Sequence, residues 1–365
     1  MQQRDYSLDA IKGLACIFMI LVHANVDKQS GIISGFQFLG GIAPVLFFAV
    51  SGVTTTFQSA SKSSSLLIIF YIMFAVLGFS YSTIWRPNFW VAFTFDLFQI
   101  IAVGVITVTL IEKILKPGKI FYFVLSIIVF LIHYCFTQIF QLQPFPFEQL
   151  LFSGKIGEYS YYSFPIFPWV MTFFIGIFAY YIQNYLNLII GVAFLVILIV
   201  WKTLHGGNLT SLPDRLDKWN MSVEYFFFSY SFVLLFFYVF RLKINYLQNN
   251  ILIYLGKYSL LFLYVHIVIV EIFEAVNFKQ PYLVWVSTFT VSYLLMKVLQ
   301  YINKYIEKFF QNFTLWIIML VSVCIIPLVI PSTNIIIITE LTIGILFANN
   351  YQSLSKLLKN YLKSQ

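Results

Sequence analysis

Three side chains that are able to do chemistry lie on the first apolar segment of the chain: Asp9, Lys12 and His23. At about 100° per residue they share one stripe of a helix, with Lys12 and His23 about 16 Å apart along its axis. Ionisable groups in membrane helices usually face the interior of the bundle. The spacing predicts a fixed cation near one membrane surface and a titratable base near the other, both opening onto a shared cavity. The alternative is that Lys12 extends to the interface and His23 caps the far end, both without chemistry.

The composition identifies the class of protein that must position these groups. The chain has 365 residues, of which 60% are hydrophobic and only 10% charged. A soluble domain is about 25% charged, so this chain cannot cover its surface in water. Disordered, coiled-coil, disulfide-rich and nucleic-acid-binding classes are excluded. The three cysteines have neither disulfide nor zinc spacing, and we expect no metal site.

Apolar runs of about 20 residues, the length that spans a bilayer, recur along the whole chain. We predict an all-α polytopic membrane helix bundle in a single domain, 1–365, with a core at about 4–310 and additional C-terminal helices at about 312–349. The spans are expected at 10–26, 37–58, 64–85, 91–112, 119–141, 164–184, 187–204, 222–240, 250–275, 281–303, 312–330 and 333–349. Only Pro331-Ser332 separates the last two, so eleven spans is the alternative to twelve.

The distribution of positive charge predicts the orientation. With the N-terminus inside, cytoplasmic segments receive fifteen of the 22 Lys and Arg residues, which favours a cytoplasmic N-terminus. Arginine is scarce, whereas Ile, Phe and Asn abound, which indicates an AT-rich bacterial genome and a multi-pass protein of the plasma membrane.

Two segments together resemble the transmembrane acyltransferase superfamily. The first is Leu8-Asp9-Ala-Ile-Lys12-Gly13, followed by His23, and the second is Phe47-Phe48-Ala-Val-Ser51-Gly52. The superfamily typically has Leu-Asp-x-x-Arg-Gly with a later His, and then Phe-Phe before Ser-Gly.

Three further segments are similar to the branch that contains heparan-alpha-glucosaminide N-acetyltransferase and its bacterial relatives. They are Asp96-Leu-Phe-Gln99, then Phe164-Pro165-Ile-Phe-Pro168-Trp169 with Gly176, and Tyr254-Leu-Gly256-Lys-Tyr-Ser259-Leu with Tyr264 and His266. The five matches keep the family's order and extend from residue 4 to about residue 270.

The resemblance implies acyl transfer across the bilayer, from cytosolic acyl-CoA, usually acetyl-CoA, to a sugar amine or hydroxyl of a glycan or glycolipid on the far side. Lys12 then stands where the family has Arg, which keeps the charge but loses the planar fork that binds phosphate. His23 takes the place of the first-helix His. As a general base it removes the acceptor's proton; the alternative is a covalent acyl-histidine intermediate.

Further candidates surround these two residues. Asp27, one turn beyond His23, is expected to orient the imidazole, unless it is a solvated loop acid. Lys257 and either Arg241 or Lys243 are expected to hold CoA phosphates with Lys12, unless they only set the orientation. The substrate-binding candidates are Asp9, Asp96, Gln99, Trp169, His266 and Glu274.

Each of these substrate-binding candidates has a structural alternative. Asp96 and Gln99 could hydrogen-bond within the bundle, and Trp169 could pack at the start of a kinked helix. Glu274 lies about 80° around the helix from His266 and is the more plausible companion for it than Glu271.

A proton-coupled transporter or flippase of a sugar-linked substrate is the rival class, with Lys12, His23 and the carboxylates as a proton relay. Partners under either hypothesis are membrane lipid and a sugar-bearing substrate, with no nucleic acid. A homodimer stays open.

Overall fold

The protein is almost entirely helical in the part that the structure describes. The computed structural model places residues 4–23, 35–36, 39–85, 96–136, 151, 155–156, 161–162, 164–204, 221–242, 250–278 and 280–364. Within these ranges the extended residues are two short strands, β1 (Lys155–Ile156) and β2 (Tyr161–Tyr162), which pair antiparallel. The all-α polytopic prediction is confirmed.

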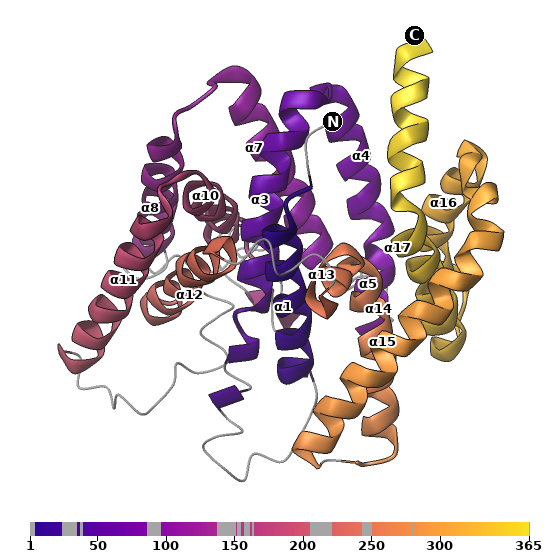
Figure 1. The fold of residues 1–365 in the computed structure, drawn as a ribbon. Coiled ribbons are helices and arrows are strands. Elements are labelled where there is room, and N and C mark those ends of the chain that lie inside the picture. The colour runs from indigo at the N-terminus through magenta and orange to yellow at the C-terminus, as the bar shows by residue number, and fades with distance from the viewer. Residues whose placement is uncertain are drawn as a thin grey trace.

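The helices follow the predicted spans closely (Figure 1). Their bounds are α1 Tyr6–His23, α3 Ala43–Ser61, α4 Ser64–Leu77, α5 Phe79–Trp85, α7 Leu97–Ile114, α8 Lys119–Tyr134, α10 Ile166–Tyr181, α11 Asn184–Leu204, α12 Val223–Leu242, α13 Ile251–Lys257, α14 Ser259–Ala275, α15 Pro281–Ile306, a 3₁₀ turn Glu307–Gln311, α16 Phe313–Val329 and α17 Thr333–Ser364. Since α16 and α17 are separate helices, the last two predicted spans are distinct elements.

By length and composition, seven helices of the described chain are apolar enough to cross a membrane, or eight if α13 and α14 form one bent span. Three more apolar helices, α8, α10 and α16, are shorter. In the part of the chain that the structure describes, the twelve predicted spans therefore correspond to a smaller number of full-length ones. Helix α3 follows a predicted span but carries Thr54, Thr55 and Thr56, and it is not among the seven.

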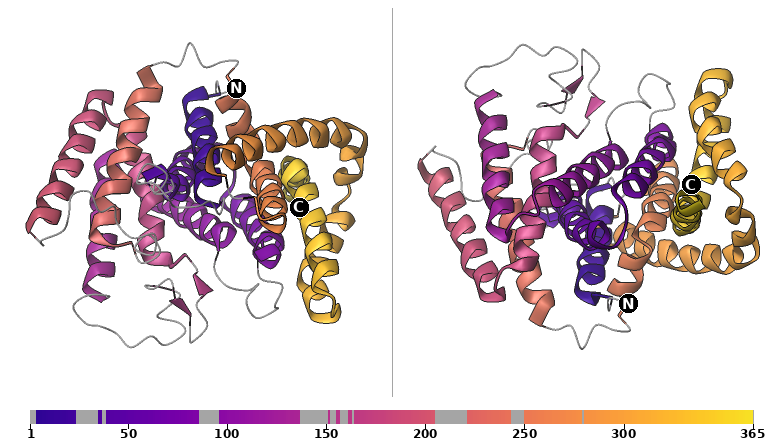
Figure 2. Two further views of the ribbon diagram at one scale, coloured as in Figure 1. Left: turned by 90° about the horizontal axis from the view of Figure 1, so that it is seen from below. Right: turned by 90° about the horizontal axis from the view of Figure 1, so that it is seen from above.

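Helix α1 lies in the middle of the bundle. In Figures 1 and 2 the group α8, α10, α11 and α12 lies on one side of it, and α15, α16 and α17 lie on the other. Its neighbours are α13, α3, α14, α12 and α15. Eleven of its residues are buried, among them Asp9, which agrees with the rule that ionisable groups of membrane helices face inward.

Glycines of the sequence motifs mark the places where helix backbones touch. A Cβ at Gly13 would overlap the main chain of Leu252 on α13, and one at Gly256 would overlap the carbonyl of Asp9 on α1. Gly52 and Gly176 play the same part where α3 crosses α10. Small residues allow this close approach between membrane helices, so the motifs fix the position of α1 against its neighbours.

The segment predicted as one span at 250–275 is broken. Helices α13 and α14 meet at Tyr258 with a bend of 96°. As a result α13 packs against the first half of α1, whereas α14 brings His266 to the other end, beside His23.

Candidate functional site

The first half of α1 borders a cavity of about 320 Å³ between α1, α3 and α10. The residues that line it are Arg4, Asp5, Leu8, Asp9, Lys12, Thr54, Phe57 and Tyr180. Lys12 was expected near such an opening, and Arg4, Asp5 and Tyr180 join it from positions that sequence reasoning did not select.

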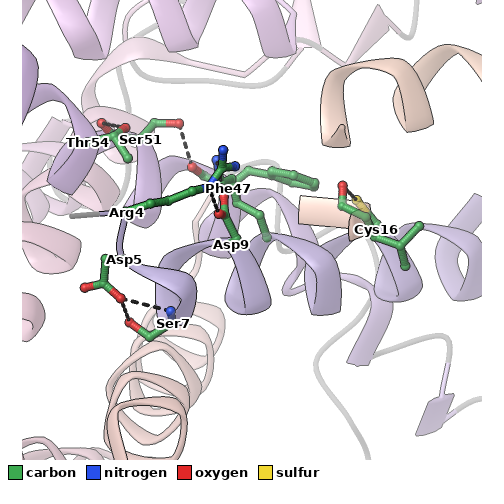
Figure 3. A network of polar contacts seen from close by, with 10 residues as sticks. Arg4, Asp5, Ser7, Asp9, Cys16, Phe47, Ser51 and Thr54 are labelled. Atoms are coloured by element: carbon green, nitrogen blue, oxygen red, sulfur yellow. Dashed lines mark hydrogen bonds and ion pairs between the residues drawn. The ribbon is translucent and has the colours of Figure 1, made fainter. Parts of the chain in front are cut away.

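The charges in this cavity are balanced by one another. Asp9 is nearly buried and accepts a hydrogen bond from Nε of Arg4, while Nζ of Lys12 lies 3.7 Å from its other oxygen. Figure 3 shows the Arg4 side chain reaching back to Asp9. Asp5 accepts hydrogen bonds from Ser7 and, at 2.8 Å, from the hydroxyl of Tyr180. An incoming anion would therefore compete with Asp9 for two cations that are already in place.

Arg4 is the more accessible of the two cations. Its side chain is 47% exposed, against 24% for Lys12. The hydrogen bond from Arg4 to Asp9 raises the pKa of the Arg4 guanidinium, so this group stays charged. A guanidinium also offers the planar fork that Lys12 lacks.

The other predicted phosphate-binding residues lie near this end of α1 but do not line the cavity. Arg241 lies over the ring of Tyr180, 5.6 Å from its centroid, and donates a hydrogen bond to the carbonyl of Ile182. Lys257 is exposed and follows Gly256, which packs on the backbone of Asp9. Lys243 lies outside the described residues.

His23 ends α1 and meets His266 of α14. Nδ1 of His23 lies 2.9 Å from Nε2 of His266, and Nδ1 of His266 lies 2.7 Å from the carbonyl oxygen of Phe262. His266 is completely buried, and its ring stacks on Phe262. Glu274, the neighbour expected for His266, is exposed near the end of α14. The neighbour that the structure gives His266 is His23. Asp27, the predicted orienting acid, lies outside the described residues.

The cavity stops short of the histidine pair. His23 is not among its lining residues, and Ala15, Cys16 and Met19, which lie along α1 between Lys12 and His23, are buried at 0, 0 and 5% exposure. Among the described residues, packed side chains fill the stretch of α1 between Lys12 and His23. A cavity shared by Lys12 and His23 therefore stays a prediction.

Asp96 and Gln99 form the capping box of α7. Asp96 accepts from the backbone N–H of Leu97 and from the Ser82 hydroxyl, while Oε1 of Gln99 accepts from the Asp96 backbone. Gln99 also donates to the carbonyl of Ala75. These bonds satisfy backbone N–H groups at the start of the helix. They fit the alternative that Asp96 and Gln99 hydrogen-bond within the bundle.

Trp169 is buried in an aromatic cluster. Its ring is completely inaccessible and packs against Phe48, Phe164 and Tyr225. Its indole N–H has no acceptor among the described residues. These contacts fit the alternative that Trp169 packs at the start of its helix.

A family model decides what kind of protein this is. The model for the catalytic region of heparan-alpha-glucosaminide N-acetyltransferase matches residues 4–202, more than half of the chain. The chain belongs to this family. It is a multi-pass membrane protein of a transmembrane acetyltransferase family, and this membership does not favour the transporter alternative. No curated protein and no solved structure gives a match.

The matched residues include α1 with Asp9, Lys12 and His23, and they end before His266, Arg241 and Lys257. The contact between His23 and His266 therefore comes from the structure. Sequence reasoning placed both histidines on apolar helices but had no signal for a pairing 243 positions apart. The signal for Arg4 was its position four residues before the Leu8-Asp9 motif.

Proposed function

We propose that the protein transfers an acyl group, most simply acetyl, from cytosolic acyl-CoA to a hydroxyl or amine of a sugar on the far side of the membrane. The supporting observation is the polarity of α1: its beginning borders a cavity with two cations, and its end carries a histidine, His23, that contacts the buried His266. The acceptor is a glycan or glycolipid, and membrane lipid surrounds the bundle.

The cavity end of α1 binds the donor. Arg4 and Lys12 exchange Asp9 for phosphate oxygens of CoA, with Arg241 and Lys257 close by. Charge-assisted hydrogen bonds from a guanidinium to phosphate are among the strong ones in proteins. This end then faces the cytosol, as the distribution of Lys and Arg predicts.

The histidine end carries out the chemistry. His23 takes the proton of the acceptor as its oxygen or nitrogen attacks the thioester carbonyl. The carbon–sulfur bond breaks, and the proton passes from His23 to the departing thiolate, so charge and atoms balance. General bases typically contribute roughly 10²–10⁴-fold to rate. An acyl-histidine intermediate is the alternative route.

The distance along α1 suits a donor with a long arm. About 16 Å of helix separates Lys12 from His23. Ala15, Cys16 and Met19 are packed between Lys12 and His23. The thioester arm therefore reaches His23 only after this part of α1 and its neighbours rearrange.

The test uses the purified protein in lipid nanodiscs with radiolabelled acetyl-CoA. Methyl glucoside offers only hydroxyls, whereas glucosamine offers an amine as well, so labelled product from glucosamine but not from methyl glucoside indicates transfer to nitrogen. We expect saturable CoA binding that is lost in Lys12→Glu, and product formation that is lost in His23→Gln. CoA binding that survives Lys12→Glu, or full turnover by His23→Gln, contradicts the proposal. Proton-coupled sugar uptake into vesicles without acetyl-CoA would instead support the transporter.

A further inference from the structure

We propose that His266 is a positioning residue that keeps the proton of His23 on Nδ1, so that Nε2 of His23 is the basic atom. The catalytic meaning of this arrangement rests on the proposed function. The arrangement itself is a statement about two protons and can be tested without any reaction.

The carbonyl of Phe262 fixes the first proton. Nδ1 of His266 lies 2.7 Å from this oxygen, which can only accept a hydrogen bond. The proton of His266 is therefore on Nδ1. The ring of Phe262, stacked 5.0 Å from that of His266 with an angle of 6° between the planes, holds the imidazole in this position.

The second proton follows from the first. A neutral imidazole with its proton on Nδ1 has a lone pair on Nε2. Nε2 of His266 lies 2.9 Å from Nδ1 of His23, so His23 must donate from Nδ1. The basic lone pair of His23 is then on Nε2.

The geometry of the two rings suits such a bond. Their centroids are 5.2 Å apart and their planes differ by 13°. The centroid distance exceeds the distance between the nitrogens by about the sum of the two ring radii, so the rings lie edge to edge and nearly in one plane. The N–H and the lone pair, which lie in the ring planes, therefore point at each other, the favourable alignment for a hydrogen bond.

The opposite arrangement requires a buried charge. If His266 donated from Nε2 as well as from Nδ1, it would be an imidazolium. His266 is completely buried, and no carboxylate forms an ion pair with it among the residues that the structure describes. An unpaired buried ion costs several kcal/mol. The neutral pair is the stable one.

This arrangement gives His266 a role that its burial alone does not. In this role His266 does not contact the substrate. It holds the His23 ring in the orientation that presents Nε2, and it continues to accept from Nδ1 when Nε2 takes the acceptor's proton. The proton on Nε2 then leaves to the thiolate, and the pair returns to its starting state.

The direct test is ¹⁵N NMR of the protein with labelled histidine in nanodiscs at a pH where the rings are neutral. The chain has only four histidines, and His23→Gln and His266→Gln assign the two signals of interest. We expect both rings to be protonated on Nδ1. A His23 protonated on Nε2 overturns the inference, whatever the activity of the protein.

Kinetics with acetyl-CoA and the better of the two sugar probes give a second readout. His266→Leu removes the acceptor and should lower kcat roughly 10- to 100-fold, the loss typical of a metal-binding histidine without its orienting partner. KM for acetyl-CoA should stay unchanged. His266→Gln, whose Oε1 can accept from His23, should recover most of the rate.

The outcomes separate the two proposals. If neither probe is acetylated but both rings carry the proton on Nδ1, the proposed function fails and the tautomer assignment holds. If His266→Leu keeps the wild-type kcat while His23→Gln loses it, the positioning role is refuted and the base stands. Thermal unfolding of His266→Leu shows whether a loss of rate reflects misfolding, in which case the NMR result decides.

Discussion

The two ends of α1 handle polar groups in opposite ways. At its beginning, the acids Asp5 and Asp9 and the cations Arg4 and Lys12 lie together beside an open cavity, and Arg4 is nearly half exposed. At its end, His23 and His266 form a hydrogen-bonded pair in which His266 is completely buried. Charges are tolerated where water reaches them, whereas in the interior the neutral form is favoured. The difference supports the proposal that one helix binds a charged donor at one end and moves a proton at the other.

The stretch between the two ends is as informative as the ends themselves. Ala15, Cys16 and Met19 are small or unbranched and tightly buried, so along this stretch the described side chains of α1 are packed rather than open. Donor binding and chemistry should therefore respond separately to substitution.

The largest effect is expected at the histidine end. His23→Gln should lower the rate of acetyl transfer by roughly 10²–10⁴-fold because the general base is lost. The affinity for CoA, measured by calorimetry on the same sample, should not change. A parallel loss of CoA binding would show that the two ends are not separate.

The contact that fixes α1 should be the next most sensitive. Gly256→Ala puts a Cβ against the carbonyl of Asp9, and overpacking of this kind costs about 1–3 kcal/mol or more. We expect a clearly lower Tm in detergent and a loss of both CoA binding and transfer. Gly118→Ala is the matched control, because a Cβ there meets nothing within 4 Å. Equal Tm values for the two variants would contradict the close packing of α1 and α13.

A smaller effect is expected at the cavity end. Arg4→Gln should weaken CoA binding roughly 10-fold, since a hydrogen bond to a charged group contributes about 1.5–3 kcal/mol. The value of kcat at saturating donor should remain. Lys113→Gln removes the same charge from an exposed position at the end of α7 and should bind normally.

A second substitution at this end sharpens the role of Arg4. Adding Lys12→Arg to Arg4→Gln supplies a guanidinium from the helix itself and should restore affinity. If Arg4→Gln binds CoA as tightly as the wild type does, Arg4 pairs with Asp9 but does not bind the CoA phosphates.

The smallest effect is expected away from α1. Glu340 of α17 is completely buried, and neither of its carboxylate oxygens has a hydrogen-bond partner among the described residues. Replacing such a group by an apolar one of similar size is often neutral or stabilising. Glu340→Met should leave transfer unchanged and raise Tm by a few degrees. A loss of acyl transfer in this variant would show that α17, and not only the two ends of α1, takes part in the reaction.

The helices were predictable because apolar length alone specifies them. The segment expected at 312–330 is a helix at Phe313–Val329, and the one expected at 281–303 begins at Pro281. Helix α17 runs fifteen residues beyond its expected end at 349, because its last turns are amphipathic and apolar length does not reveal them. The bend at Tyr258 was also missed, since the apolar pattern continues through it.

The sequence predicted the part of the site that lies on one helix but not the contacts between helices. Helix periodicity placed Asp9, Lys12 and His23 on one stripe, because these residues share an element. It could not place His266 against His23, or Tyr180 beside Asp5, because such contacts depend on how distant helices cross. For His266, periodicity suggested Glu274 as a companion, whereas the bend between α13 and α14 directs α14 so that His266 lies beside His23.

The most direct test of the account is a cryo-EM map of the protein with CoA bound. The account predicts phosphate density at Arg4 and Lys12, and the thiol end of the ligand extending along α1 to His23, with Ala15, Cys16 and Met19 displaced to admit it. CoA bound on another face of the bundle, or with its thiol end directed away from His23, would contradict it.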